Sequence, residues 1–284
     1  MAFRLGSRMV RNVPLADYLR ETVQCFPIIE LQSDPKFFSA NFAFTANERS
    51  ALRIYQDRFH FQLTMHGPFS NINLGALNIE ERQVGMRIFE NTIHISAGLG
   101  IELITFHPIS FLPGMTTEQY REACLLEEDS ISHLLKEARK SGVTLLIENM
   151  PALAEYHPST RDGSRFQELL WLFPDTEFGL TLDIGHALQA GISIEALLKM
   201  ERVRHFHFHD NDRTSDLHQP IMKDLDWWGK LVKNLAKKFP DAAAILEIDG
   251  LKDQLDSYKN LSKFLSKPAN ASKKRALMIP PILP

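Results

Sequence analysis

The sequence has little cysteine and no long apolar segment. Its 284 residues include 2 cysteines, Cys25 and Cys124, which are too far apart for a C-x-x-C pair. This excludes a disulfide framework and gives no sign of a thiolate zinc site. No segment approaches the roughly 18 apolar residues that span a membrane, and residues 1–6 lack the apolar run of a secretion signal. We therefore expect a cytoplasmic protein without a membrane segment.

An excess of positive charge is also absent. Lys and Arg number 32 against 35 Asp and Glu, a formal net charge of −3. The chain thus has no general attraction for a polyanion, and no basic run with interleaved aromatics follows a predicted strand. This disfavours a nucleic-acid partner and favours a small-molecule substrate. The composition, 44% hydrophobic and 24% charged, is that of a folded protein; a homo-oligomer is compatible with it.

Short apolar runs alternate with longer segments of helical period, which is the pattern of repeated βα units. Two expected helices, Glu80–Gly98 and Thr117–Ser141, are the clearest, and the second stops at Gly142 as a helix C-terminus should. The expected strands are Phe3–Gly6, Phe26–Leu31, Gln62–His66, Glu102–His107, Thr144–Glu148, Phe178–Asp183, Val203–His209 and Ala244–Ile248. Eight units in a chain of this length predict an α/β fold, a single (β/α)8 TIM barrel, which typically takes about 250 residues.

The predicted domain organisation is one barrel and one tail. We find no linker before residue 266, so residues 1–266 are assigned to the barrel. Residues 267–284 form a C-terminal tail, either mobile or docked, whose prolines forbid a regular helix.

Ionisable residues end or closely follow the expected strands. Active sites of TIM barrels lie at the C-terminal ends of the strands. The residues concerned are Glu30, His66, His107, Glu148, Asp183, His207, His209 and Glu247. A single histidine at a strand end more often forms a hydrogen bond with a neighbouring carbonyl than binds a metal ion. A buried charge without a partner, however, costs several kcal/mol, so the whole set of carboxylates and histidines favours a bound cation. Oxygen and imidazole ligands predict a divalent metal, Zn²⁺ or Mn²⁺ first, with Mg²⁺, Fe²⁺ or Co²⁺ as alternatives.

The seventh expected strand has a strict alternation. His205, His207 and His209 alternate with Phe206 and Phe208, so the three imidazoles share one face of the strand. Two orientations are compatible with this pattern, and we predict the one in which the histidines point into the barrel.

Four short motifs in a fixed order carry a family resemblance. They are His66-Gly67-Pro68-Phe69, Glu148-Asn149, Leu182-Asp183-Ile184-Gly185-His186 and Asp216-Leu217-His218-Gln219-Pro220. Over nearly all of residues 3–265 the chain resembles the xylose isomerase-like barrels, which include sugar epimerases, inosose dehydratase and the endonuclease IV-like enzymes of AP endonuclease family 2.

The resemblance to the epimerases of this family implies one metal ion. Its ligands would be Glu148, Asp183, His207 and Glu247, and the two glutamates would exchange a proton through a cis-enediolate. His186, Arg213 and His209 would contact the substrate, although an exposed ion pair is an equally ordinary role for Arg213. Our leading hypothesis from sequence is a metal-dependent isomerase or epimerase of a sugar, sugar phosphate or related polyol.

The resemblance to endonuclease IV implies a cluster of zinc ions instead. The matching residues are His66, His107, Glu148, Asp183, His186, His207, Asp216, His218 and Glu247. The alternative hypothesis is therefore a phosphoester hydrolase that acts on a small substrate rather than DNA. A third is a binding module without activity. The D-x-H element in this family usually continues into a Gly-x-Gly turn that residues 220–223 lack, so the resemblance does not identify the substrate.

Overall fold

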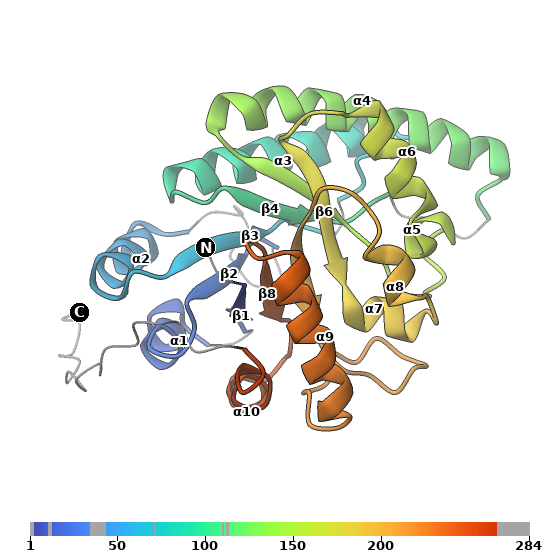
Figure 1. Cartoon of the computed structure of the whole chain (residues 1–284). Helices are drawn as coiled ribbons and strands as arrows, with labels where there is room; N and C mark the ends of the chain where they lie inside the picture. Colours follow the sequence, from blue (N-terminus) through green and yellow to red (C-terminus); the bar gives the residue numbers. More distant parts are fainter. Residues whose placement is uncertain are drawn as a thin grey trace.

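A computed structural model describes residues 3–10, 13–34, 44–70, 72–109, 111 and 114–265. Eight parallel strands close into a barrel in sequence order, and the first strand pairs with both the second and the eighth. Helices surround the strands, with the long α3 and α4 side by side (Figure 1). The predicted fold class, a single (β/α)8 barrel, is confirmed.

The strands are β1 Arg4–Arg8, β2 Ile28–Gln32, β3 Gln62–His66, β4 Leu103–Phe106, β5 Thr144–Glu148, β6 Phe178–Asp183, β7 Val203–Phe208 and β8 Ala243–Leu246. The helices are α1 Leu15–Thr22, α2 Ala46–Phe59, α3 Ile79–Gly98, α4 Thr117–Ser141, α5 Ser159–Asp162, α6 Ser164–Leu172, α7 Ile184–Gln189, α8 Ile194–Leu197, α9 Leu225–Lys238 and α10 Leu251–Ser262.

The observed strands differ from the expected ones mainly at their ends. Strand β1 continues two residues beyond the prediction, to Arg8, whereas β4, β7 and β8 stop before His107, His209 and Glu247. Each of these three polar residues is the first residue after its strand instead of the last residue within it. They remain at the C-terminal mouth of the barrel.

Local signals explain the helices that the sequence shows most clearly. Helix α4 begins with a capping box, in which the Thr116 side chain and Gln119 satisfy each other's backbone N–H groups. It ends at Gly142, whose φ of 68° is the left-handed conformation that favours glycine. Helix α3 is capped by Asn78, whose side chain accepts hydrogen bonds from the backbone N–H groups of Glu80 and Glu81.

The alternation in β7 separates two environments. Phe206 and Phe208 point outward, 5.4 Å from the rings of Phe239 and Trp228 respectively. His205 and His207 are fully buried on the other face, where both contact Glu30 of β2 across the barrel. The prediction of inward histidines is therefore confirmed, and the barrel interior is polar at this level.

The opposite end of the barrel interior is apolar. Ile28, Ala243 and Ile245 form a small buried cluster there. Gly6 belongs to this layer, because a Cβ atom at that position would lie 2.4 Å from Ile28 Cγ2. Close packing leaves no room for a larger residue.

No helix in the described part of the chain is both long and apolar enough to cross a membrane. The predicted tail, residues 267–284, lies outside the described residues, and the division at residue 266 stays a prediction.

Candidate metal centre

The nine residues that match the zinc ligands implied by the endonuclease IV resemblance come together at the C-terminal mouth of the barrel. Three adjacent groups, within each of which the donor atoms lie within 4.8 Å of one another, together contain all nine, and a further group of His66, His207 and Glu247 links the first two. The first group is His66, His107 and Glu148; the central group is Glu148, Asp183, His207 and Glu247; the third group is His186, His209, Asp216 and His218. Glu148 belongs to two groups, and His209 joins the third although the resemblance did not include it.

In the first group, two imidazoles face one carboxylate oxygen. The Nε2 atoms of His66 and His107 lie 3.5 and 3.4 Å from Glu148 Oε2. The Nδ1–H of His66 donates to the carbonyl of Gly67 at 2.9 Å, which leaves Nε2 for the group. Glu148 Oε2 is buried and has no hydrogen-bond partner among the described residues. That orphaned oxygen fits a cation.

The central group surrounds His207 with carboxylates. Its Nδ1 atom lies 2.6 Å from Glu148 Oε1, 2.8 Å from Glu247 Oε2 and 3.9 Å from Asp183 Oδ2. Burial acts to raise the pKa of Glu148, but the charge of His207 and hydrogen bonds from its neighbours hold that pKa well below the usual range. The carboxylates in turn raise the pKa of His207 against the effect of burial. Three buried carboxylates around one imidazole are a donor set suited to a divalent metal ion.

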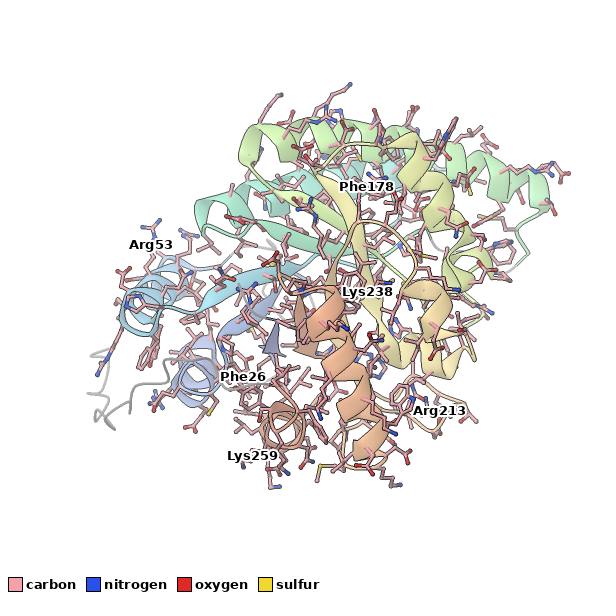
Figure 2. The ribbon with its side chains drawn as sticks, viewed as in Figure 1. Phe26, Arg53, Phe178, Arg213, Lys238 and Lys259 are labelled. Carbon is pink, nitrogen blue, oxygen red and sulfur yellow. The ribbon has the colours of Figure 1, made fainter. Side chains whose placement is uncertain are left out.

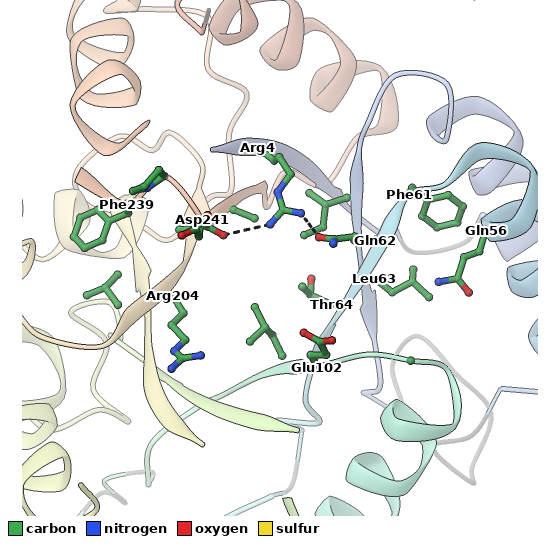
Figure 3. A pocket seen from close by; sticks show the side chains of 17 residues that line it. Arg4, Gln56, Phe61, Gln62, Leu63, Thr64, Glu102, Arg204, Phe239 and Asp241 are labelled. Carbon is green, nitrogen blue, oxygen red and sulfur yellow. Dashed lines mark hydrogen bonds between the residues drawn. The ribbon is translucent and has the colours of Figure 1, made fainter. Parts of the chain in front are cut away.

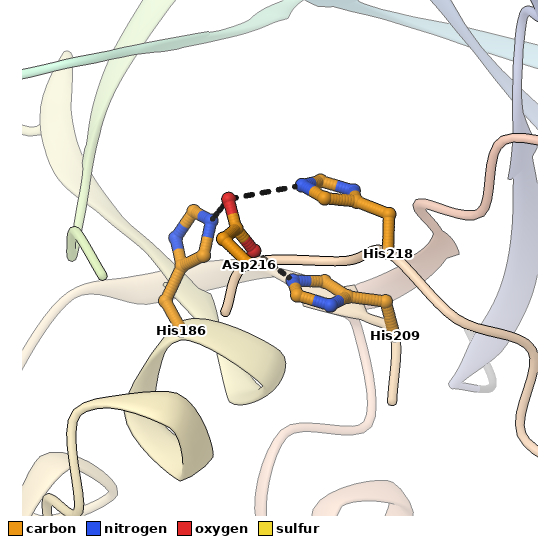
Figure 4. A group of neighbouring side chains, drawn as sticks. All are labelled: His186, His209, Asp216 and His218. Carbon is orange, nitrogen blue, oxygen red and sulfur yellow. Dashed lines mark ion pairs between the residues drawn. The ribbon is translucent and has the colours of Figure 1, made fainter. Parts of the chain in front are cut away.

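The third group gathers three histidines around Asp216, as Figure 4 shows. The Nε2 atoms of His186 and His218 lie 3.5 and 3.3 Å from Asp216 Oδ2, and that of His209 lies 3.7 Å from Oδ1. Burial acts to lower the pKa of His186, but the carboxylates of Asp183 and Asp216 raise it to about 10. A bound metal ion would displace that proton.

Sequence reasoning counted Glu30 in the set of ionisable residues that favours a cation but did not name it as a ligand; it contacts His207 of the central group. Its carboxylate is fully buried, 2.9 Å from His205 Nε2 and 3.2 Å from His207 Nε2. Because a carboxylate only accepts, the His207 Nε2 atom carries a hydrogen, and its Nδ1 atom faces the central group. The available signal was a charged residue inside the apolar run of β2.

Arg8 was missed altogether. Its Nη1 atom donates to Glu247 Oε1 at 2.8 Å and its Nη2 atom to Asp249 Oδ1 at 2.7 Å. Arg8 is buried, so this pair holds one oxygen of Glu247 while the other faces His207. The expected strand stopped at Gly6, which placed Ser7 and Arg8 in a loop.

Arg213 lies apart from the three groups. It is on the loop before α9 (Figure 2), its side chain is 45% exposed, and its Nη2 atom lies 3.9 Å from Asp210 Oδ1. An exposed ion pair of this kind is the alternative role that the sequence allowed for Arg213. A contact of Arg213 with substrate stays a prediction.

Residues 25–267 match the family described as xylose isomerase-like TIM barrel. The chain belongs to this family.

Two curated relatives show the range of the family. The uncharacterized protein MJ1311 of Methanocaldococcus jannaschii is 24% identical over 214 residues, which cover 74% of this chain and 72% of that protein. A probable endonuclease 4 of Campylobacter concisus is 31% identical over 131 residues, which cover 44% of this chain and 42% of that protein. The similarity to this endonuclease 4 thus spans less than half of either chain.

Solved structures show the same fold. A D-tagatose 3-epimerase-like protein superposes with a TM-score of 0.80 at 19% identity, covering 92% of this chain and 97% of that one. The TTHB071 protein of Thermus thermophilus, soaked with ZnCl2, superposes with a TM-score of 0.64 at 22% identity, covering 93% and 98%. Enzymes, sugar epimerases among them, are thus neighbours of this chain in fold.

Proposed function

We propose that the protein is a metal-dependent phosphoester hydrolase with more than one divalent ion, zinc or manganese, at the barrel mouth. The observation that carries this proposal is the position of Glu148, whose Oε2 faces His66 and His107 while its Oε1 faces His207. One buried carboxylate shared by two donor groups is an arrangement suited to neighbouring ions.

Residues at different positions in the mouth would have different roles. The first and central groups would hold the ions that act on substrate, and when bound these ions supply water activation and neutralise charge on a phosphate and its leaving group. Within the first and central groups His107 is 18% exposed, whereas Glu148 and His207 are fully buried, so substrate would approach these two groups over His107. The Tyr156 hydroxyl, 3.4 Å from His107 Nδ1, stands beside that approach. Glu30 and Arg8 would hold His207 and Glu247 in place.

Two observations limit the substrate class. Relatives named endonuclease 4 are consistent with phosphoester chemistry. The net charge of −3 lacks the electrostatic attraction on which nucleic-acid binding depends, which favours a small phosphoester over DNA.

The test is hydrolysis by the zinc-loaded and manganese-loaded protein of a panel of small phosphomonoesters and phosphodiesters, with a DNA duplex in parallel. Elemental analysis counts the ions in the same samples. We expect more than one ion per chain and turnover of a small ester that Glu148→Gln abolishes. A fully loaded protein that cleaves no ester, or one that holds a single ion, would contradict the proposal.

A second candidate, a sugar or sugar phosphate isomerase or epimerase, is favoured by a different observation. The central group alone has the four donors of a one-ion site, with Glu148 and Glu247 both in contact with His207, and the fold neighbours include sugar epimerases. Against it, the Arg8 ion pair stabilises Glu247 as an anion, whereas proton exchange needs it to gain and lose a proton. Deuterium uptake from D2O into a panel of sugars and sugar phosphates tests it, and Glu247→Gln must stop that uptake.

A further inference from the structure

We propose that the third group is a closed metal site in which His209 is the fourth ligand, and that its ion holds the loop after β7 instead of meeting substrate. The inference builds on the proposed metal centre but requires no particular reaction. Sequence resemblance placed only His186, Asp216 and His218 in this position and made His209 a substrate contact.

The hydrogen bonds around the group determine which nitrogen of each ring is available. His186 Nδ1 lies 2.8 Å from the carbonyl of Asn149, His218 Nδ1 lies 2.7 Å from that of Glu247, and His209 Nδ1 lies 3.4 Å from that of Asp210. A carbonyl only accepts, so each Nδ1 atom carries the hydrogen. The Nε2 atom of all three rings is therefore the one left for a metal ion, with its ring oriented by backbone.

These three Nε2 atoms converge on one carboxylate. Figure 4 shows the rings of His186, His209 and His218 on three sides of Asp216. His209 is fully buried, and its Nε2 atom, 3.7 Å from Asp216 Oδ1 and 3.2 Å from Asp183 Oδ1, makes no hydrogen bond among the described residues; neither does Asp216 Oδ1. Three imidazole nitrogens and one carboxylate are a complete tetrahedral set for zinc.

Packing holds His209 in this place. A Cβ atom at residue 185 would lie 2.2 Å from His209 Cε1, so only glycine lets α7 approach the ring. On its other side the ring stacks on His218, with centroids 4.1 Å apart and an interplanar angle of 7°.

The backbone of the loop is also shaped for the group. His218 has a φ of 45°, a left-handed conformation that is uncommon for a residue with a side chain. Asp210 and Gln219 pair through two backbone hydrogen bonds of 2.9 and 2.8 Å, which close the loop that carries Asp216 and His218. The need to place the His218 ring as a metal ligand is a direct reason for the left-handed backbone conformation of this residue.

Donor number then separates the roles of the groups. Zinc sites with four protein ligands are typically structural, whereas catalytic sites keep a position open for water or substrate. The third group offers four donors that it shares with no other group, whereas the first group offers three and shares Glu148 with the central group. An ion in the third group would join the start of α7, the end of β7 and the loop after it, and the open position would lie at the first group.

The experiment is chelator competition on the full-length zinc-loaded protein, with elemental analysis at each chelator concentration. The wild type should retain one ion per chain after the others are removed. His209→Asn should release that ion at chelator concentrations more than about 100-fold lower, since removal of an outer-shell partner alone typically costs 10- to 100-fold in affinity. The matched control is His205→Asn, a buried β7 histidine outside the group, which should retain the tightly held ion. If His209→Asn retains it with unchanged affinity, the proposal is wrong.

A second measurement needs no variant. The crystal structure of the zinc-loaded wild type should show His209 Nε2 about 2.0–2.1 Å from an ion that also binds Asp216. An ion bound without His209, whose Nε2 atom instead pairs with Asp183 Oδ1, now 3.2 Å away, overturns the assignment. Neither experiment measures turnover, so a protein that hydrolyses no phosphoester would sink the proposed function and leave this inference intact.

Discussion

Charged side chains are buried at one end of the barrel and exposed to solvent at the other. At the C-terminal mouth, carboxylates and imidazoles are buried together, and Glu148 and Asp183 each keep an oxygen without a hydrogen bond among the described residues. At the N-terminal end, a cavity of about 600 Å³ is also lined by charged residues (Figure 3), but Glu102, Arg204 and Asp241 are exposed to solvent.

Solvation accounts for the difference between the ends. Exposed charges at the N-terminal cavity are stabilised by water, and Arg4 also donates to Gln62 and to the carbonyl of Asp241. Buried charges at the mouth need partners of opposite sign, and the described residues supply too few. A large cavity by itself is therefore a poorer guide to chemistry than buried, incompletely paired donors.

The strongest test of this contrast exchanges one glutamate at each end. Glu148→Gln should lower zinc affinity at the mouth by at least about 100-fold, because two donor groups lose a carboxylate. Glu102→Gln at the N-terminal cavity should change neither zinc affinity nor zinc content. Isothermal titration of the metal-free variants with zinc measures both, and equal effects would remove the distinction between the two ends.

Added zinc should stabilise the fold only by binding at the C-terminal mouth of the barrel. Free zinc at 1,000 times its Kd adds about 4 kcal/mol per site, or roughly 8–16 °C in melting temperature for a domain of this size. Differential scanning calorimetry of chelator-treated protein, with and without zinc, measures the shift. The increment should persist in Arg204→Gln and shrink in Glu148→Gln; a shift that Glu148→Gln leaves unchanged would locate the ion elsewhere.

Two arginines sharpen the comparison in the metal-free protein. Arg8→Met leaves the buried Glu247 without its ion pair and should lower the free energy of unfolding by about 3–5 kcal/mol. Arg4→Met, at the half-exposed N-terminal position, should cost under about 1 kcal/mol. Urea unfolding followed by circular dichroism gives both values. Similar losses would show that burial does not govern the contribution of these arginines.

The smallest expected effect is on the stability of the metal-free protein at low pH. Burial acts to raise the pKa of Glu30, but His207 and His205 lower it to about 2 from 4.5. A carboxyl group whose pKa is lower in the folded state stabilises the fold above its unfolded pKa, and that contribution is lost as the pH falls from about 4.5 towards 2. Urea midpoints of the metal-free protein from pH 6 to pH 3 should therefore fall less steeply in Glu30→Gln than in wild type. Parallel pH profiles would rule out a charged Glu30.

The sequence predicted the barrel more completely than the site. Apolar runs such as Thr144–Glu148 are visible because strands covered on both faces need continuous apolar residues. The inward face of β7 followed from its period of two. Arg8 escaped notice because Gly6-Ser7-Arg8 has no apolar signal, and it lies in β1 through pairing with Glu30 of β2. His209 was placed at the mouth but with a different role, since periodicity does not say which carboxylate a ring faces.

The sequence by itself determined that eight strands would form a barrel and that imidazoles and carboxylates would meet at its C-terminal mouth, because apolar periodicity and the residues at strand ends are local properties. Only the tertiary structure decided which atoms share a site. Barrel closure brings Arg8 to Glu247 across 239 residues, and backbone carbonyls orient the rings of His186, His209 and His218 towards Asp216. Donor groups depend on distances between separate strands and loops, which no local pattern contains.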